Sequence, residues 1–236
     1  MEYDNIKGII FDYDGTVDIR GDRWAEVMLD AFRSNGIELS LPALKHTAEA
    51  VGTYLISDDL IQPTDDFTAM MRTCARLMLQ RLSDNYQIGS RFTDTSATAD
   101  AIARYCLSYM NAVFEVDRPV IGALADRFRL VLVSRYYPNF GAMLDEFGLS
   151  QYFRQIIQSR HTGTDAGDGD IILRGVEALG LPAAEILVIG GSLRSDIGPA
   201  LAHGCRALWI ADKSRAGEAP DGVALAGSLR AALKLI

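Results

Sequence analysis

The chain has 236 residues, of which 49% are hydrophobic and 23% are charged, and its formal net charge is −8 at pH 7. No apolar run approaches the roughly 18 residues that a membrane-spanning helix needs, so we expect no membrane segment. The negative charge repels a nucleic-acid backbone, and no run of Lys or Arg counters it, so nucleic acids are excluded as expected partners.

The first residues and the cysteines bear on where the protein works. The opening MEYDNIKGIIFDYDG lacks the basic start, apolar stretch and small-residue cleavage site of a secretory signal, so we expect a cytoplasmic location. Cys74, Cys106 and Cys205 are odd in number and widely spaced. This spacing fits neither a disulfide framework nor a zinc site, and it predicts three buried thiols.

The first predicted element is a short apolar strand at Gly8–Phe11, and more than a hundred residues separate it from the next such run at Leu130–Val133. An ordinary crossover does not need a connection of that length, so a domain is predicted to be inserted there. Within the gap, apolar residues recur with the i, i+3, i+4 spacing of amphipathic helices. Four such stripes run through residues 24–32, 41–55, 67–78 and 99–113.

Cap and turn signals bound these stripes. Asp22 could cap the first helix, Gly36 closes it, and Pro63 and Thr64 precede the third. Four helices joined by short polar loops predict a small bundle domain. The third stripe is rich in Met, which could instead mark an adaptable binding surface. Pro119 is predicted to open a further helical turn that leads back to the next strand.

The rest of the chain alternates strands with helices. Short runs rich in Ile, Val and Leu predict buried parallel strands at Leu130–Val133, Gln155–Gln158, Ile186–Ile189 and Ala207–Ile210. Segments of helical period lie between them at Asn139–Phe147, Asp170–Leu179 and Asp196–His203. The predicted fold class is therefore α/β, with a doubly wound parallel sheet and an inserted α-helical bundle. We expect the core domain in residues 1–17 and 117–236 and the helical domain in residues 18–116.

The strongest local signal directly follows the first strand, in the run Asp12-Tyr13-Asp14-Gly15-Thr16. The strand delivers two carboxylates, one residue apart, to its carboxyl end, where open α/β sheets bind ligands. Asp12 and Asp14 then lie on the same side of the extended chain, and Gly15 allows an abrupt turn. A divalent cation, or a proton on one carboxylate, is expected to relieve their repulsion. The pair could also serve only as a turn and helix cap.

This segment resembles the first motif of the haloacid dehalogenase-like (HAD) superfamily, an apolar strand followed by Asp-x-Asp-Gly-Thr and then Val or Leu. The resemblance implies a Rossmann-type HAD core with a helical cap of the C1 type, which closes over a substrate. It also implies that Asp12 attacks phosphorus, forming an aspartyl-phosphate, and that Asp14 protonates the leaving group and later activates water. We expect Gly15 and Thr16 to help bind substrate. A non-acid such as Tyr at position 14 would suggest the haloacid dehalogenases themselves, so Asp14 favours phosphoryl chemistry.

The second family motif is a Ser or Thr at the end of the next core strand, which donates a hydrogen bond to the phosphoryl group. Ser134 ends the predicted strand at 130–133 and fits that description, although serines at strand ends are also common turn formers. Arg135 follows it, where relatives often carry Asn. This arginine could bind a phosphate or simply face solvent.

The third motif departs from the family pattern Ser-x-x-x-Gly-x-x-Lys-Pro-Asp-Pro. Ser159, Gly163 and Asp168 match it, whereas Ala166 stands at the lysine position. None of the four lysines of the chain lies between the helical insert and the last predicted strand. In the family that lysine neutralises the aspartate and the incoming phosphoryl oxygens. Arg160 is the nearest cation in sequence and could replace it, although a guanidinium is not an equivalent point charge.

The fourth motif departs as well. The strand at 186–189 continues into Gly-Gly-Ser, where the family has Gly-Asp-Ser-x-x-x-Asp, so Gly191 replaces an acid that usually helps to ligate magnesium. Asp196 is retained and could take over the ion, or could only cap the helix that it opens. The glycine pair could also bind an anion through backbone amides. The resemblance implies Mg²⁺ as cofactor, with Asp12, Asp14 and Asp196 as its ligands.

Two functional hypotheses follow. The first is a magnesium-dependent phosphatase of a small soluble phosphate ester, in which the helical cap excludes water, and the protein is a monomer or a homodimer. The second is a catalytically impaired relative that binds a phosphorylated ligand or a protein partner without turnover. It is motivated by the joint absence of a lysine at Ala166 and of an acid at Gly191. No turnover, with a large gain from restoring both side chains, would support it.

Overall fold

A computed structural model describes residues 3–18, 24–57, 59–85, 95–134, 138–158 and 171–236. The chain divides into two compact units. We call residues 1–21, 113–136 and 148–236 the core unit, and residues 22–112 and 137–147 the helical unit.

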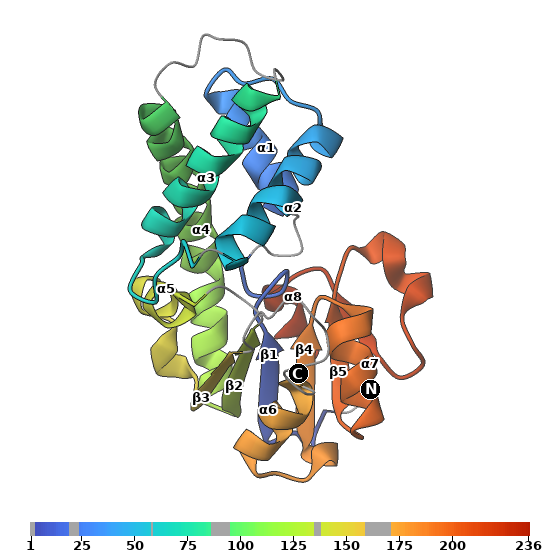
Figure 1. Ribbon diagram of the computed structural model, residues 1–236. Helices are drawn as coiled ribbons and strands as arrows, with labels where there is room; N and C mark the ends of the chain where they lie inside the picture. The colour runs from blue at the N-terminus through green and yellow to red at the C-terminus, as the bar shows by residue number, and fades with distance from the viewer. Residues whose placement is uncertain (1–2, 19–23, 58, 86–94, 135–137, 159–170) are drawn as a thin grey trace. The chain divides into compact units, whose positions relative to one another are not determined.

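The core unit is built on a parallel sheet of six strands in the order β3-β2-β1-β4-β5-β6 (Figure 1). The strands are β1 (Gly8–Asp12), β2 (Arg129–Ser134), β3 (Gln155–Gln158), β4 (Ile186–Gly190), β5 (Arg206–Ile210) and β6 (Ala224–Ala226). Each neighbouring pair is parallel, which confirms the predicted α/β class with a doubly wound sheet. The first five strands match the predicted runs to within one residue at each end.

Helices connect these strands and cover the sheet. They are α6 (Ile171–Leu179), α7 (Gly198–Ala202) and α8 (Leu229–Ala232), with the short helical segments η1 (Ser150–Tyr152), η2 (Ala183–Glu185), η3 (Leu193–Ile197) and η4 (Lys213–Glu218). Helix α6 packs on β1, β2 and β3, whereas α7 packs on β5 and α8 on β5 and β6. Gly175 of α6 allows a close approach, because a Cβ atom there would lie 3.0 Å from Cδ1 of Ile10. The chain leaves β1 toward β2 and returns to the other side at β4, so β1 and β4 flank the switch point where such sheets bind ligands.

The helical unit contains the four predicted amphipathic stripes, each in its own helix. The helices are α1 (Trp24–Ser34), α2 (Leu41–Ser57), α3 (Phe67–Asp84) and α4 (Thr95–Ala125). The last part of α4, residues 113–125, belongs to the core unit. Gly36 ends the turn after α1 with a φ of +76°, as its sequence position predicts. Asp66 caps α3, because its Oδ1 accepts a hydrogen bond from the backbone N–H of Ala69 at 2.6 Å. Asp22, the predicted cap of α1, lies outside the described residues.

Pro119 was expected to open a further helical turn, but it lies inside α4. A proline removes one backbone donor, here the one that would reach the carbonyl of Glu115. Both residues are exposed, so water reaches that position and the helix continues.

Helix α5 (Phe140–Glu146) groups with the helical unit, although its position after β2 placed it in the predicted core range 117–236. Its Glu146 accepts a hydrogen bond from the backbone N–H of Phe67, the first residue of α3, at 2.7 Å. The rings of Phe67 and Phe147 meet edge to face, with centroids 5.5 Å apart. Asn139 also donates to the carbonyl of Asp65 at 3.2 Å. These contacts bind α5 to the start of α3, and the periodicity of either segment alone does not reveal them.

All three cysteines are free, and Cys106 and Cys205 are buried as predicted, whereas Cys74 is only partly buried. Among the described residues, no helix is long and apolar enough to cross a membrane.

Candidate active site at the end of the first strand

The turn that follows β1 presents its two carboxylates at the centre of the sheet edge. The backbone N–H of Tyr13 donates to the carbonyl of Val133 at 3.1 Å, which carries the pairing with β2 one residue past Asp12. The N–H of Thr16 then donates back to the carbonyl of Tyr13 at 3.1 Å. Gly15 has a φ of +76°, in the region that favours glycine, so this tight turn depends on it.

Asp12 is buried, with 4% of its surface exposed. The hydroxyl of Thr16, itself fully buried, lies 3.4 Å from Oδ2 of Asp12 as a hydrogen-bond donor. Thr16, which was predicted to contact substrate, is therefore placed against the carboxylate of Asp12 and holds its orientation.

Asp14 has a different environment, since its side chain is exposed. The buried hydroxyl of Ser134, at the end of β2, donates to Oδ2 of Asp14 at 3.2 Å. The structure thus brings together the predicted residues of the first two motifs, Asp12, Asp14, Thr16 and Ser134, across two neighbouring strand ends.

Asp18 belongs to this turn as well, although the sequence analysis gave it no role. Its side chain is 1% exposed, and its Oδ1 accepts a hydrogen bond from the backbone N–H of Gly15 at 2.7 Å. A carboxylate bound in this way fixes the peptide plane between Asp14 and Gly15. The signal in the sequence is an Asp three residues after the glycine of a turn, a spacing at which such side chains often bind the backbone.

The fourth motif reaches the same turn through Gly191, which follows β4. A Cβ atom at position 191 would lie 2.9 Å from the carbonyl oxygen of Gly15 and 3.2 Å from Oγ1 of Thr16. The indole N–H of Trp209 donates to the carbonyl of Gly191 at 2.9 Å and holds the loop from its other side. Gly191 is therefore packed against the turn after β1, and it leaves no room for a side chain in this arrangement.

Asp196 is buried within η3, a single π-helical turn, and does not open the helix as predicted. Ser192 is the cap of this turn, since its Oγ accepts a hydrogen bond from the N–H of Ser195 at 3.1 Å. Oδ2 of Asp196 accepts the N–H of Ser192 at 2.8 Å. The Ser192 side chain thus satisfies the N–H of Ser195 and the Asp196 side chain that of Ser192, an arrangement close to a capping box, so Asp196 stabilises the start of this turn. The amide of Ser192 is thereby used within the loop and is not directed at an anion.

The predicted magnesium ligands Asp12, Asp14 and Asp196 do not form a metal cluster. In the described part of the chain, no group of three or more His, Cys, Asp or Glu side chains is placed to hold a metal ion. One oxygen of Asp196 is bound to its own loop, and Gly191 neither supplies a carboxylate nor has space for one. Mg²⁺ usually keeps several waters and is held by one or two carboxylates together with substrate phosphate, so Asp12 and Asp14 are the described side chains that would hold it.

Several predicted site residues lie outside the described residues. They are Arg135, Arg160, Ala166 and the rest of the third motif between positions 159 and 170.

Comparisons with known proteins agree with this arrangement. A family model described as haloacid dehalogenase-like hydrolase matches residues 6–204. The chain is 32% identical over 87 residues to 5-amino-6-(5-phospho-D-ribitylamino)uracil phosphatase YigB of Escherichia coli (strain K12), a match that spans 37% of this chain and 35% of the relative.

Two solved structures cover nearly the whole chain. One is the HAD-hydrolase YfnB of Bacillus subtilis, bound to magnesium, with a TM-score of 0.55, 15% identity and 98% of each chain covered. The other is a dehalogenase with an intermediate complex, with a TM-score of 0.60, 14% identity and coverage of 99% of this chain and 98% of that one. At these identities the two structures show a shared fold.

Proposed function

The chain belongs to the haloacid dehalogenase-like hydrolase family, and we propose that it is a phosphatase that hydrolyses a small phosphate monoester through an aspartyl-phosphate on Asp12. The observation that carries the proposal is the pair of carboxylates after β1. Asp12 is buried under the hydroxyl of Thr16, whereas Asp14 is exposed beside the hydroxyl of Ser134. Two carboxylates in different environments are suited to different roles.

The proposed reaction has two steps. In the first, a carboxylate oxygen of Asp12 bonds to phosphorus while the bond from phosphorus to the ester oxygen breaks, and Asp14 gives its proton to the leaving alcohol. In the second, Asp14 takes a proton from water, whose oxygen bonds to phosphorus as the bond to Asp12 breaks. Inorganic phosphate leaves, and both carboxyl groups return to their starting states. The hydroxyl of Ser134, which donates to Asp14 in the free protein, can donate its hydrogen bond to a phosphoryl oxygen instead and so orient the substrate.

Asp14 distinguishes this chemistry from dehalogenation within the family. A dehalogenase has no leaving alcohol to protonate, so it does not need a second acid two residues after the nucleophile. The exposed carboxyl of Asp14 supports the phosphatase, as does the name of the Escherichia coli relative, which is that of a phosphatase of a small phosphorylated metabolite.

Magnesium was predicted as the cofactor, and a solved relative of low identity is described as magnesium-bound. Because the described residues of this chain do not assemble three carboxylates, we assign the steps above to its own side chains. We expect Mg²⁺ to bind weakly, with a dissociation constant of about 1 mM or higher, to the two acids after β1. Titration calorimetry on protein dialysed against EDTA measures this, and micromolar binding would contradict it.

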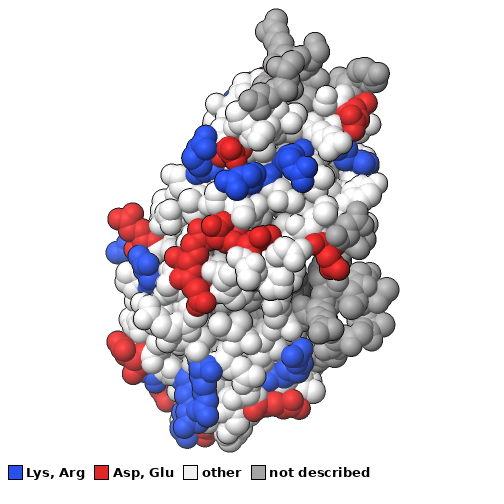
Figure 2. All heavy atoms as spheres, turned by 60° about the vertical axis from the view of Figure 1, so that its left-hand side comes forward, with Lys and Arg blue, Asp and Glu red and all other residues white. Residues whose placement is uncertain are grey.

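We further propose a small molecule, and not a nucleic acid, as the substrate, and a monomer or homodimer as the working form. The formal net charge is −8, and on the described face in Figure 2 basic and acidic side chains gather in separate groups, so neither sign covers it. Such a surface supports no long-range attraction of a nucleic-acid backbone.

The test is turnover of a panel of sugar, nucleotide and acyl phosphates, with and without Mg²⁺, by the purified protein and the variant Asp12→Asn. The amide keeps the shape of the side chain and an acceptor for Thr16, so folding is preserved while the nucleophile is lost. We expect Asp12→Asn to abolish turnover, by about 10³-fold or more. Asp221→Asn makes the same change at an exposed site of the core unit and is expected to leave the rate unchanged. Equal rates in Asp12→Asn and the unmodified protein would refute the role of Asp12.

The impaired relative is the second candidate, and the packing of Gly191 favours it. The loop after β4 is fitted to the turn after β1 without the family's acid, so the site lacks that charge and has no space to regain it. If this reading holds, inorganic phosphate binds at the turn, as seen by NMR shifts of the Gly15 and Thr16 amides, while no member of the panel turns over.

A further inference from the structure

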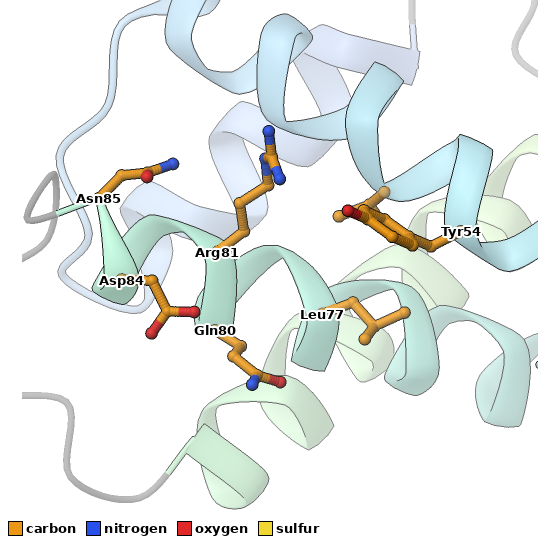
Figure 3. Close-up of a pocket in the computed structure, with 7 residues that line it drawn as sticks. Tyr54, Leu77, Gln80, Arg81, Asp84 and Asn85 are labelled. Atoms are coloured by element: carbon orange, nitrogen blue, oxygen red, sulfur yellow. The ribbon is translucent and has the colours of Figure 1, made fainter.

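A pocket in the helical unit lies between α2 and α3 (Figure 3), and none of its lining residues belongs to the candidate active site. Its volume is 320 Å³, at the lower end of the range of about 300–1,000 Å³ for small-molecule sites. Val51 and Tyr54 of α2 and Leu77 and Arg81 of α3 line it, with Asp84 and Asn85 at the end of α3.

Arg81 is the unusual residue of this pocket. Its Nε is buried and has no hydrogen-bond partner, and no ion pair of Arg81 is found within the described part of the chain. The residue as a whole is only partly buried, but a charged donor atom that is buried without an acceptor is costly, and native proteins contain few of them. By contrast, Arg72, nine residues earlier on the same helix, pairs with Asp100. The described residues therefore place this guanidinium beside a pocket without supplying an acceptor for its Nε.

The other walls indicate the shape of the missing acceptor. Figure 3 shows the ring of Tyr54 reaching across from α2 with its hydroxyl end toward Arg81, while the carboxylate of Asp84 points away from that guanidinium. Tyr54 is 52% exposed, a large fraction for an aromatic side chain, and Val51 and Leu77 provide apolar surface. A ligand that fills this space thus meets an aromatic ring and aliphatic groups on its body and a cationic fork at one end.

The charges nearby decide between a carboxylate and a phosphate. A guanidinium pairs with either through two parallel N–H donors. However, α3 ends at Asp84, and the C-terminus of a helix carries a partial negative charge. The acid and the helix end both disfavour a dianion more than a monoanion, because the repulsion scales with the charge of the ligand.

We propose that this pocket binds a small monocarboxylate with a flat apolar body, held by Arg81 and covered by the ring of Tyr54. The proposal does not depend on the phosphatase reaction, since none of these residues belongs to the turn after β1. Arg81 would then be retained for the ligand and not for the stability of the unliganded protein.

The test uses benzoate as the probe on the full chain, with binding followed by amide NMR shifts in α2 and α3. We expect saturable binding at millimolar concentration, at least about tenfold weaker binding of benzamide, the neutral compound of the same shape, and no saturable effect of inorganic phosphate. Arg81→Met is expected to abolish benzoate binding and to leave the melting temperature of the free protein equal or higher, because it removes the buried unpartnered donor. Arg76→Met, on an exposed face of α3, is the matched control and is expected to bind benzoate normally.

Any of three results would overturn the proposal. Benzoate could fail to shift the α2 and α3 amides of the unmodified protein, benzamide or phosphate could shift those amides as strongly as benzoate does, or Arg81→Met could bind benzoate undiminished. A lower melting temperature of free Arg81→Met would also contradict it, because the guanidinium would then stabilise the fold by itself.

Discussion

Replacing Gly191 by alanine tests whether the loop after β4 is fitted to the turn after β1. The added Cβ would lie 2.9 Å from the carbonyl oxygen of Gly15, whereas ordinary contacts of a Cβ atom begin near 3.4 Å. One of the two backbones must therefore move by about 0.5 Å, the difference between these distances. Neither side yields easily, because Asp18 holds the N–H of Gly15 and Trp209 holds the carbonyl of Gly191.

The expected loss of stability follows from this overlap. Forcing an extra carbon into a well-packed region costs about 1–3 kcal/mol when the surroundings cannot relax. For a chain of about 150–250 residues, each kcal/mol lowers the melting temperature by about 2–4 °C. We therefore expect Gly191→Ala to melt about 2–12 °C below the unmodified protein.

Thermal unfolding followed by circular dichroism measures this shift, with Gly217→Ala as the matched control. Gly217 lies in the same unit, in η4, and a Cβ atom there would meet nothing within 4 Å. The control is expected to leave the melting temperature unchanged or slightly raised, because alanine lowers the entropy of the unfolded chain. If Gly191→Ala and Gly217→Ala melt together, the loop after β4 has room for a side chain and our account of Gly191 is wrong.

Three further measurements test other parts of the structure. Asp18→Ala is expected to lower kcat for a phosphate ester that the protein hydrolyses by about tenfold or more, with little change in KM, because the turn carrying Asp14 loosens. Asp18→Asn keeps an acceptor for the N–H of Gly15 and is expected to keep most of the rate. Asp66→Ala removes a similar hydrogen bond at the cap of α3 and is expected to leave kcat unchanged. Burial raises the pKa of Cys106 to about 12 and that of Cys205 to about 11, so at pH 8 a disulfide reagent should label both slowly until urea is added, and rapid labelling would show that these thiols are accessible. Burial also raises the pKa of Glu146 above its ordinary 4.5, so the folded state holds this proton more tightly than the unfolded state. The stability from this group is full below pH 4.5 and is lost as the pH rises through the raised pKa, and Glu146→Gln should flatten that part of the melting-temperature profile.

The sequence predicts the sheet well because its strands are buried on both faces. Runs such as Ile186–Ile189 are continuous in apolar residues, and the helices between them keep a clear period. The last strand, β6, escapes prediction because it has only three residues, Ala224–Ala226, which carry no pattern by themselves. The assignment of α5 to the helical unit and not to the core unit also escapes prediction, because it depends on contacts of Glu146 and Phe147 with Phe67, which is far away in sequence.

The candidate site divides in the same way. Asp12, Asp14 and Ser134 end strands that are neighbours in the sheet, so their meeting follows from the order of elements. The environment of Asp196 does not follow, because a carboxylate near a helix start can turn toward a metal or toward its own backbone, and only the atomic positions separate the two. The role of Asp18 was readable in principle from its spacing to Gly15, yet the same spacing occurs in many turns of no functional interest.

The position of Gly191 changes how the two functional readings should be distinguished. Read from sequence, this glycine is a missing acid, and restoring it together with a lysine at Ala166 is a natural test for an impaired enzyme. In the structure, the direction in which an aspartate side chain would leave position 191 points at the carbonyl of Gly15 and the hydroxyl of Thr16. Gly191→Asp is thus expected to displace the turn that carries Asp14, and with it any residual activity.

A failed rescue by Gly191→Asp is therefore expected both for an active phosphatase and for an impaired relative, and it would not distinguish them. Turnover that is lost in Asp12→Asn supports the enzyme, whereas phosphate binding at Gly15 and Thr16 without turnover supports the impaired relative. The structural account of position 191 stays testable through Gly191→Asp itself. A Gly191→Asp protein that melts at the same temperature as the unmodified chain and gains activity would show that the loop accommodates the acid, and the packing against Gly15 would then be incidental to the site.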